Sequence, residues 1–321
     1  MLARTMGRVQ GFLGLADSAG ACERGHPPMA PITRWRHSPE YLRGVMSRKR
    51  VLTWLVHDTG LYRVLDRVWW SNRSIEVTRH VVPAPVERRV RVALIADLHV
   101  VRPGPRERRL LELIERERPD AIALNGDFGA LGGPPDACGP VLEQLKAPLG
   151  VWASLGNWDY GNPVADWRSF LAAHGVRLML NESARLVDRL WLLGLDSALV
   201  GWPDLDRALS GVPTDAFVVG LIHCPVLFED LAGRVPLALA GHTHGGQVRL
   251  PGVRPLYMPR GCWPYVSGWY ERDGSRMYVS RGIGCPSLPV RVACPPELAI
   301  FEFAPTDKAA EVGLLWPTGP R

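Results

Sequence analysis

Seven side chains that can bind metal ions stand at or just beyond the ends of short apolar runs in this sequence: Asp97, His99, Asp127, Asn157, His223, His242 and His244. Each run has the length and composition of a buried strand, and α/β sheets place their ligands at the carboxyl ends of strands. Asp97 and His99 are two residues apart, as are the two histidines of GHTH. Because alternate residues of an extended chain point the same way, the members of each pair can converge on one point.

The ligand types restrict the metal. Two aspartates, one asparagine and four histidines favour Mn²⁺, Fe²⁺ or Zn²⁺ over Mg²⁺ and Ca²⁺, which prefer oxygen. Seven ligands are too many for one tetrahedral zinc ion, and they suit two ions that share a carboxylate and leave positions open for water and substrate. Each motif alone is more often structural, since Asp after Gly is common in turns. The ordered set of five motifs predicts a two-metal hydrolytic centre.

Other catalytic templates are absent from the sequence. It contains neither G-x-x-x-x-G-K-[ST] nor G-x-S-x-G, and GIGCPS lacks the last glycine of G-x-G-x-x-G. No serine has the surroundings of a nucleophile. A P-loop nucleotide-binding protein, a dinucleotide-binding protein and a serine hydrolase are therefore disfavoured.

The composition favours a globular protein with phosphate-bearing partners. The chain of 321 residues has a net charge of +6, with 46% hydrophobic and 22% charged residues. Such a charge suits nucleic acid, an anionic membrane or a phosphorylated substrate, and does not choose among them. The six cysteines form no C-x-x-C pair, so we interpret them as buried free thiols in a reducing compartment.

We divide the chain into four segments. Residues 1–45 are expected to be a disordered extension, because Gly, Pro, Ala and Arg dominate and no apolar period persists. GFLGLADSAGAC faintly resembles a signal peptide, but its apolar part is too short and too interrupted. Residues 46–74 are predicted to form a basic amphipathic helix, which either lies in a membrane interface or packs on the protein's own core. Residues 75–304 form the main domain, and 305–321 a loose tail. No uninterrupted apolar run approaches the length of a membrane span.

Strands alternate with helices in the main domain. Runs such as VRVALIADLH, DAIALNGD and FVVGLIH are typical of buried strands. The stretches at 105–118 and 163–175 are typical of helices, and Pro119 ends the first. This alternation predicts an α/β fold in which helices cover buried sheets.

The order D-x-H, G-D, G-N-x-D, H, G-H-x-H resembles the calcineurin-like metallophosphoesterase superfamily over residues 90 to 304. GHTHGGQ and YVSRGIGCPSLPVRVACPPEL resemble more narrowly its YkuE/YaeI branch of phosphodiesterases. That branch has membrane-associated members and includes a UDP-2,3-diacylglucosamine hydrolase of lipid A synthesis. The resemblance implies a metallophosphoesterase domain at 75–304 with a four-layer α/β/β/α sandwich, and a hydroxide between two metals that attacks phosphorus in line.

The resemblance also divides the seven ligands between two metal ions. It assigns to the first ion Asp97, His99 and His244. It assigns to the second ion Asn157, His223 and His242, with Asp127 bridging both ions. Of the candidate ions, Mn²⁺ is our first choice.

One position departs from the family pattern. The family has G-N-H-D or G-N-H-E, whose histidine is thought to protonate the leaving oxygen, whereas GNWDYG has Trp158 there. Indole has no titratable proton near neutral pH, while Asn157 and Asp159 remain as the catalytic residues of this motif. Either catalysis is lost and the centre is a binding scaffold, or the substrate needs no acid. Since general acid catalysis contributes about 10²- to 10⁴-fold and all seven ligands are kept, we favour an active enzyme on an activated ester or a pyrophosphate.

Three residues are candidate substrate contacts. Trp158 offers a flat surface to a nucleobase, a sugar or an acyl group. Arg260 and Arg281 can reach a phosphate, although ordinary salt bridges explain such arginines equally well.

The leading hypothesis is a two-metal phosphoesterase at the cytoplasmic face of the cell membrane. It would cleave a phosphodiester or a lipid-linked nucleotide pyrophosphate such as UDP-2,3-diacylglucosamine, and its N-terminal helix would lie on the anionic surface. A nucleic-acid phosphodiesterase is the first alternative, which the absence of a nucleic-acid-binding module disfavours. A non-catalytic, metal-dependent scaffold is the second.

Overall fold

The computed structural model describes residue 36 and residues 74–130, 135–249, 255, 258–259, 261–286 and 288–306. The predicted extension at 1–45 therefore lies outside the described residues except for Arg36. The predicted helix at 46–74 lies outside them except for Ser74, as do Arg260 and the tail beyond Thr306.

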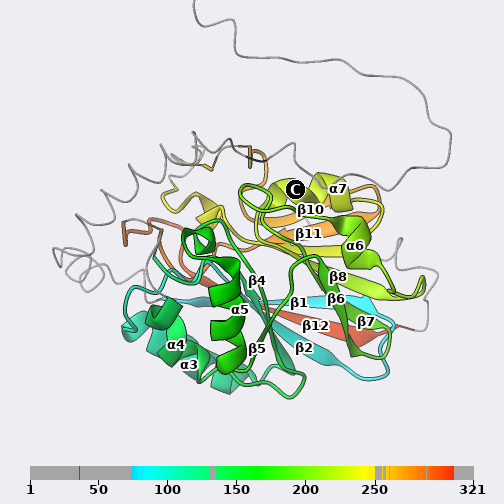
Figure 1. Cartoon of the computed structure of the whole chain (residues 1–321), viewed down its shortest axis with the longest axis horizontal. Coiled ribbons are helices and arrows are strands. Elements are labelled where there is room, and N and C mark those ends of the chain that lie inside the picture. Colours follow the sequence, from blue (N-terminus) through cyan, green and yellow to red (C-terminus); the bar gives the residue numbers. More distant parts are fainter. Residues whose placement is uncertain are drawn as a thin grey trace, which may run out of the picture.

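Among the described residues, twelve strands form two mixed sheets of six strands each (Figure 1). The first sheet contains, in spatial order, β1 (Glu76–Ala84), β12 (Glu297–Pro305), β2 (Val90–Ala96), β3 (Ala121–Asn125), β4 (Val151–Ser154) and β5 (Val176–Leu178). The second sheet contains, in spatial order, β10 (Gly268–Arg272), β11 (Ser275–Val279), β9 (Leu237–Ala240), β8 (Phe217–Ile222), β7 (Leu190–Gly194) and β6 (Glu182–Val187).

Both sheets have a parallel centre. In the first sheet only β12 and β2 pair antiparallel, and the other neighbours are parallel. In the second sheet β10–β11 and β6–β7 are antiparallel, and the three pairs between them are parallel. Every residue of β3, β8 and β9 is buried, which explains why these strands are continuous apolar runs without alternation.

The helices α3 (Pro105–Glu117), α4 (Gly139–Leu142) and α5 (Val164–Ala173) accompany the first sheet, and α6 (Leu205–Leu209) and α7 (Phe228–Leu231) accompany the second (Figure 1). Short 3₁₀ turns occupy Pro135–Cys138, Asp159–Gly161, Pro225–Leu227 and His244–Gly246. α3 begins with Pro105 at its first position, and the Glu107 carboxylate accepts the Gly104 N–H at 2.7 Å. It ends where Arg118 adopts a left-handed conformation ahead of Pro119. The predicted helices at 105–118 and 163–175 are thereby confirmed to within two residues at each end.

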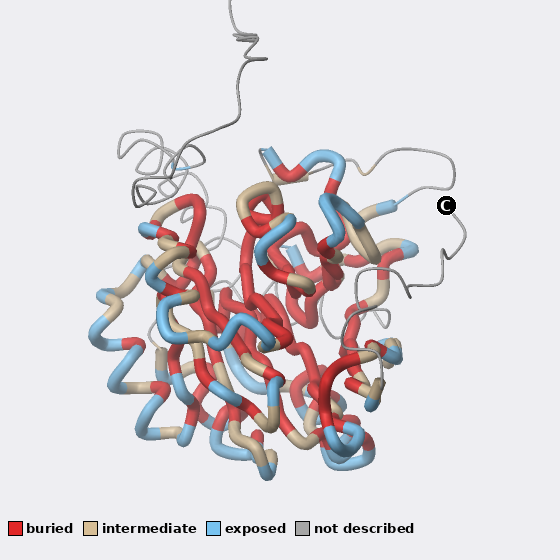
Figure 2. Tube along the Cα trace, turned by 90° about the vertical axis from the view of Figure 1, so that its right-hand side faces the viewer, coloured by how far each residue is buried: buried red, intermediate tan, exposed pale blue. Residues whose placement is uncertain are grey.

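Three apolar cores separate four layers. The core between the sheets includes Leu94, Leu192 and Phe301. A second core packs α3, α4 and α5 on the first sheet, and a third packs α6 and α7 on the second. Figure 2 shows the buried residues concentrated in the interior of the molecule and the exposed residues at its periphery. The predicted α/β fold and its four-layer α/β/β/α arrangement are confirmed.

Asn125 fastens the two sheets to each other. Its side-chain amide donates to the carbonyl oxygens of Ile222 at 3.3 Å and Leu239 at 2.9 Å, both in the second sheet. Its amide oxygen accepts the Ser154 hydroxyl proton at 2.8 Å. Because all of these atoms are buried, each hydrogen bond also satisfies a group that would be costly to leave unpaired. The carboxyl ends of β3, β4, β8 and β9 are held together in this way.

Candidate metal centre

The loops at the carboxyl ends of five strands bring the seven predicted residues together. β2, β3 and β4 of the first sheet lead into three of these loops, and β8 and β9 of the second sheet lead into the other two. Two groups of potential ligands result, and within each the ligand atoms lie within 4.8 Å of one another. The first group is Asp97, His99 and His244, and the second is Asp127, His223 and His242.

Asp127 belongs to the second group and also faces the first. Its Oδ2 is 3.6 Å from Nε2 of His99 and 3.5 Å from Nε2 of His223. Its other oxygen, Oδ1, accepts the backbone N–H of Trp158 at 2.8 Å. One carboxylate oxygen therefore faces both sets of imidazoles while the second is held by the chain.

The first group has nitrogen and oxygen lone pairs that point at one another. His99 and His244 approach with their Nε2 atoms 3.2 Å apart, and Nε2 of His244 is 3.5 Å from Oδ1 of Asp97. Burial lowers the pKa of His99 to about 4. Burial, together with the nearby His99 and Arg291, also places the pKa of His244 well below its usual value. Both rings are therefore neutral near pH 7, which is the form that binds a metal.

In the second group, backbone contacts fix the orientation of His223. Its Nδ1 lies 2.9 Å from the carbonyl oxygen of Asn125, so Nδ1 donates and Nε2 faces the centre. Nε2 is 3.2 Å from Oδ1 of Asn157. Burial alone would lower the pKa of His223, but the charge of Asp127 and then Asp97 raises it to about 10. The two carboxylates therefore favour positive charge at this position of the centre.

Two carboxylates are buried at the centre. Asp97 is 0% exposed, and burial raises its pKa to about 7, against the lowering effect of His223. Asp127 is 2% exposed, and the charge of His223 outweighs burial and lowers its pKa. Buried carboxylates require a compensating positive charge. Together with the converging neutral imidazoles, they form a donor set that fits divalent transition-metal ions.

The backbone is strained at the centre. Five residues of the set have positive φ between 44° and 69°: Asp97, His99, Asp127, His242 and His244. Residues other than glycine rarely adopt this backbone conformation. It costs about 1–3 kcal/mol per residue and is concentrated at functional sites.

Glycines allow the loops to approach the carboxylates. A Cβ on Gly156 would lie 2.2 Å from Oδ1 of Asp127, and a Cβ on Gly241 would lie 2.5 Å from Oδ2 of Asp97. Real side chains never approach so closely, so both positions require glycine.

Trp158 is buried at the centre, with 4% of its surface exposed. Its ring meets that of His99 edge-on, with centroids 4.6 Å apart and planes at 74°. The side chain therefore forms part of the wall beside the first group. Its predicted contact with substrate stays a prediction.

Asp159 holds two loops through its carboxylate. Oδ2 accepts the N–H groups of Asp127 and Gly156, both at 2.8 Å, and Oδ1 accepts that of Phe128 at 2.9 Å. Burial and the charge of Asp127 raise the pKa of Asp159 to about 7, against these three hydrogen bonds. Its contacts are those of a positioning residue, which fixes the loops after β3 and β4.

Arg281 lies in ion pairs. Its guanidinium donates to Glu76 at 2.8 Å and lies 3.4 Å from Glu297. Two interpretations of Arg281 follow from the sequence, and these ion pairs match the ordinary salt bridge. Its contact with a substrate phosphate stays a prediction. Arg260, the other arginine, is outside the described residues.

Arg291 was not predicted from the sequence. It is 1% exposed, and its Nη2 donates to the carbonyl oxygens of Arg281 at 2.8 Å, Gly282 at 3.2 Å and Gly284 at 2.6 Å. Nη2 also lies 3.4 Å from Nδ1 of His244. A single arginine in the apolar stretch PVRVAC was the available signal, since a buried guanidinium must have partners.

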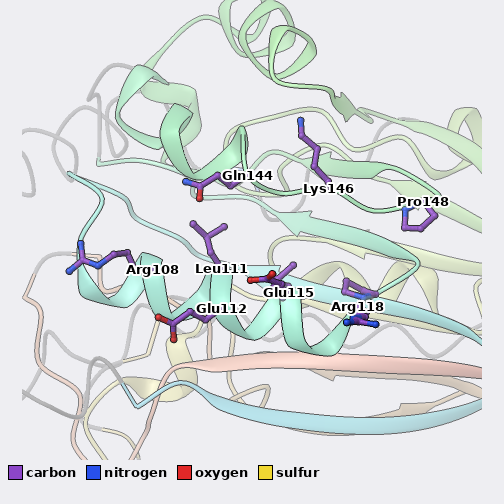
Figure 3. Close-up of a pocket in the computed structure, with 10 residues that line it drawn as sticks. Arg108, Leu111, Glu112, Glu115, Arg118, Gln144, Lys146 and Pro148 are labelled. Carbon is purple, nitrogen blue, oxygen red and sulfur yellow. The ribbon is translucent and has the colours of Figure 1, made fainter.

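A groove of about 630 Å³ lies elsewhere, beside α3 (Figure 3). Arg108 and Glu112 of the helix line one side, and Gln144 and Lys146 line the other. Its lining among the described residues includes none of the seven ligands, and its charges are mixed. The groove is therefore separate from the metal centre.

Comparisons with known proteins point to one family. A family model described as calcineurin-like phosphoesterase matches residues 90–246. The uncharacterized metallophosphoesterase YkuE of Bacillus subtilis (strain 168) is 32% identical over 205 residues, which are 60% of this chain and 71% of that protein. An uncharacterized metallophosphoesterase of Aquifex aeolicus (strain VF5) is 29% identical over 258 residues, or 75% of this chain and 94% of that protein.

A further relative is named as a transmembrane protein. The transmembrane protein with metallophosphoesterase domain of Danio rerio is 26% identical over 234 residues, which are 65% of this chain and 52% of that protein. In the part of this chain that the structure describes, no helix has both the length and the apolarity needed to cross a membrane.

Proposed function

The chain belongs to the calcineurin-like phosphoesterase family and is a metal-dependent phosphoesterase, and on this premise we propose that it hydrolyses a phosphodiester or pyrophosphate bond at the centre between the two sheets. The observation that carries the proposal is the convergence of two buried ligand groups on the shared carboxylate of Asp127.

We propose two divalent ions, with Mn²⁺ as the first choice and Fe²⁺ or Zn²⁺ as alternatives. Asp97, His99 and His244 hold the first. Asn157, His223 and His242 hold the second, and Asp127 is shared. When bound, such ions lower the pKa of water and withdraw charge from the phosphoryl oxygens.

The protein's own groups orient these ligands. The Asn125 carbonyl fixes the tautomer of His223. The N–H of Trp158 holds Oδ1 of Asp127, which leaves Oδ2 to face the imidazoles. Asp159 restrains the loops that present Asp127 and Asn157, so it acts through them rather than on the substrate.

Trp158 determines the leaving group in this proposal. Its indole N–H does not titrate near neutral pH, so position 158 supplies no acid for the leaving oxygen. A phosphate that leaves from a pyrophosphate, or an aryl oxide, needs no such proton. The favoured substrate class is therefore an activated ester or a pyrophosphate.

We further propose a lipid-linked nucleotide such as UDP-2,3-diacylglucosamine as the substrate and the inner face of the cell membrane as the location. The support is the membrane-spanning relative together with the basic, tryptophan-containing sequence at 46–74. Arg260 and Arg281 are the proposed phosphate contacts, and Trp158 the proposed surface for the remainder of the substrate.

The test compares leaving groups at one position. Mn²⁺-loaded protein should cleave a pyrophosphate or an aryl phosphodiester far faster than an alkyl monoester. Trp158→His should gain on the alkyl ester by up to about 10²- to 10⁴-fold. Trp158→Phe is the matched control, since it also lacks the indole but supplies no proton, and it should show no gain.

A second candidate, the non-catalytic scaffold, is favoured by the same tryptophan. Wild-type protein that binds two ions and hydrolyses none of the three substrate types would establish the scaffold and refute the enzyme.

A further inference from the structure

Two buried cysteines lie beside the metal centre. Cys224 follows His223 directly at the end of β8, and Cys262 lies in the segment between β9 and β10. They are 1% and 0% exposed, and their sulfur atoms are 3.7 Å apart. Residues 38 positions apart in sequence are therefore brought into direct contact.

His242 completes a third group of potential metal ligands. One of its ring nitrogens and the two sulfur atoms all lie within 4.8 Å of one another. Two thiols and an imidazole form a softer donor set than the carboxylates and imidazoles of the hydrolytic centre, and such sets select Zn²⁺.

The spacing of the sulfur atoms suits zinc. Zn–S bonds are about 2.3 Å long, and tetrahedral geometry then places two coordinating sulfurs about 3.8 Å apart. The observed separation is 3.7 Å, so both thiolates could bind one ion without a change in their spacing. The imidazole supplies a third ligand, and the fourth position is open to water.

Two other buried thiols behave differently. Cys138 donates to the carbonyl oxygen of Pro135 at 3.1 Å, and Cys294 donates to that of His244 at 3.3 Å. These thiols satisfy backbone acceptors, as structural cysteines do. Cys224 and Cys262 contact each other, and the distance between their sulfur atoms is that of a chelating pair.

We propose that Cys224, Cys262 and His242 form a zinc site next to the hydrolytic centre, with His242 common to both. Binding releases the two thiol protons, because only thiolates coordinate the ion. A neutral imidazole has a single free lone pair, so His242 serves one ion at a time. Zinc at the thiol site withdraws His242 from Asp127 and His223, and thereby inhibits the Mn²⁺-loaded enzyme.

The direct test uses Co²⁺ as a spectroscopic probe for the zinc position, with a phosphine reductant present to keep the thiols reduced. Wild-type protein should show the near-ultraviolet charge-transfer absorption of thiolate bound to Co²⁺. Cys224→Ser and Cys262→Ser should lose it, whereas Cys138→Ser, which alters a buried thiol outside the group, should keep it. Circular dichroism verifies that each variant is folded.

The zinc ligands give a second measurement. After dialysis against Zn²⁺, X-ray absorption should show zinc–sulfur bonds of about 2.3 Å in Cys138→Ser and none in either of the two serine variants. Absence of the charge-transfer band in folded wild-type protein, or its persistence in both serine variants, would overturn the proposal. Neither measurement depends on hydrolysis, so failure of the zinc-site proposal can be distinguished from failure of the proposed function.

Inhibition is measured separately. The zinc concentration that halves the Mn²⁺-dependent rate should rise at least tenfold in Cys262→Ser relative to Cys138→Ser. Equal zinc sensitivity in the two variants would refute the sharing of His242.

Discussion

Replacing Gly156 by alanine tests whether the position of Asp127 controls catalysis. The added Cβ would lie 2.2 Å from Oδ1 of Asp127 and 2.6 Å from its backbone nitrogen. The oxygen would have to move by about 1 Å to restore normal contact. No positive φ is involved at Gly156, so the perturbation is purely steric.

The expected effect follows from that displacement. Because misplacing a catalytic group by about 1 Å can cost 10²-fold, we expect the rate constant kcat to fall about 100-fold, equivalent to about 2.7 kcal/mol in the barrier. Overpacking should lower the free energy of unfolding by about 1–3 kcal/mol. Initial rates at saturating Mn²⁺ and urea unfolding provide the two measurements.

Gly129→Ala is the matched control. Gly129 follows Asp127 by two residues in the same loop, and a Cβ there would lie 3.9 Å from the nearest atom, the Val100 carbonyl oxygen. Its rate should be that of wild type, and its free energy of unfolding should be unchanged or higher by up to about 1 kcal/mol, because alanine restricts the unfolded chain. A Gly156→Ala enzyme that is as fast as Gly129→Ala would show that the hydrolytic centre does not depend on where Asp127 sits.

Two further predictions concern groups outside the ligand set. Arg291→Met removes the donor to the carbonyl oxygens of Arg281 and Gly284. Each unpaired group costs about 1–3 kcal/mol, so the free energy of unfolding should fall by about 2–6 kcal/mol. A urea unfolding curve that matches wild type would contradict these hydrogen bonds. The pKa of His80 is lowered by burial and by the charge of Arg276, against the raising effect of Glu297. Its ring also accepts the Trp269 indole N–H at 3.3 Å, so the folded protein favours the neutral form. The unfolded chain binds the proton first, so the His80 contribution to stability should decline as pH falls below about 6.5 and should level off below the folded pKa. Relative to His80→Phe, wild-type protein should therefore lose stability between about pH 8 and about pH 5, and equal losses in the two proteins would contradict the shift.

Local patterns in the sequence predicted the elements and identified the side chains that the fold brings together at the centre. The runs at β3 and β8 are apolar throughout because both faces of each strand are buried. Pro105 and Pro119 mark where α3 begins and where it must have ended. These candidate ligands could be identified because each one follows a strand, and parallel strands end at the same edge of a sheet.

Contacts between segments that are distant in the sequence could not be predicted from such local patterns. Arg281 pairs with Glu76, 205 positions away, only because β1 lies beside β12. Asn125 acts as the link between the sheets, a role that depends on how β3 faces β8 and β9. The approach of Cys224 to Cys262 likewise depends on tertiary packing. Residue spacing carries no information about these distances.

The place of β12 has a consequence for the order of assembly. This strand, at the far end of the domain, inserts between β1 and β2, and β12 is the neighbour through which β1 joins its sheet. During synthesis on the ribosome, residues 76–84 must therefore wait for some two hundred later residues before they find their partner. Until then β2 has an exposed edge, and chaperones that shield unpaired strands would act during this interval.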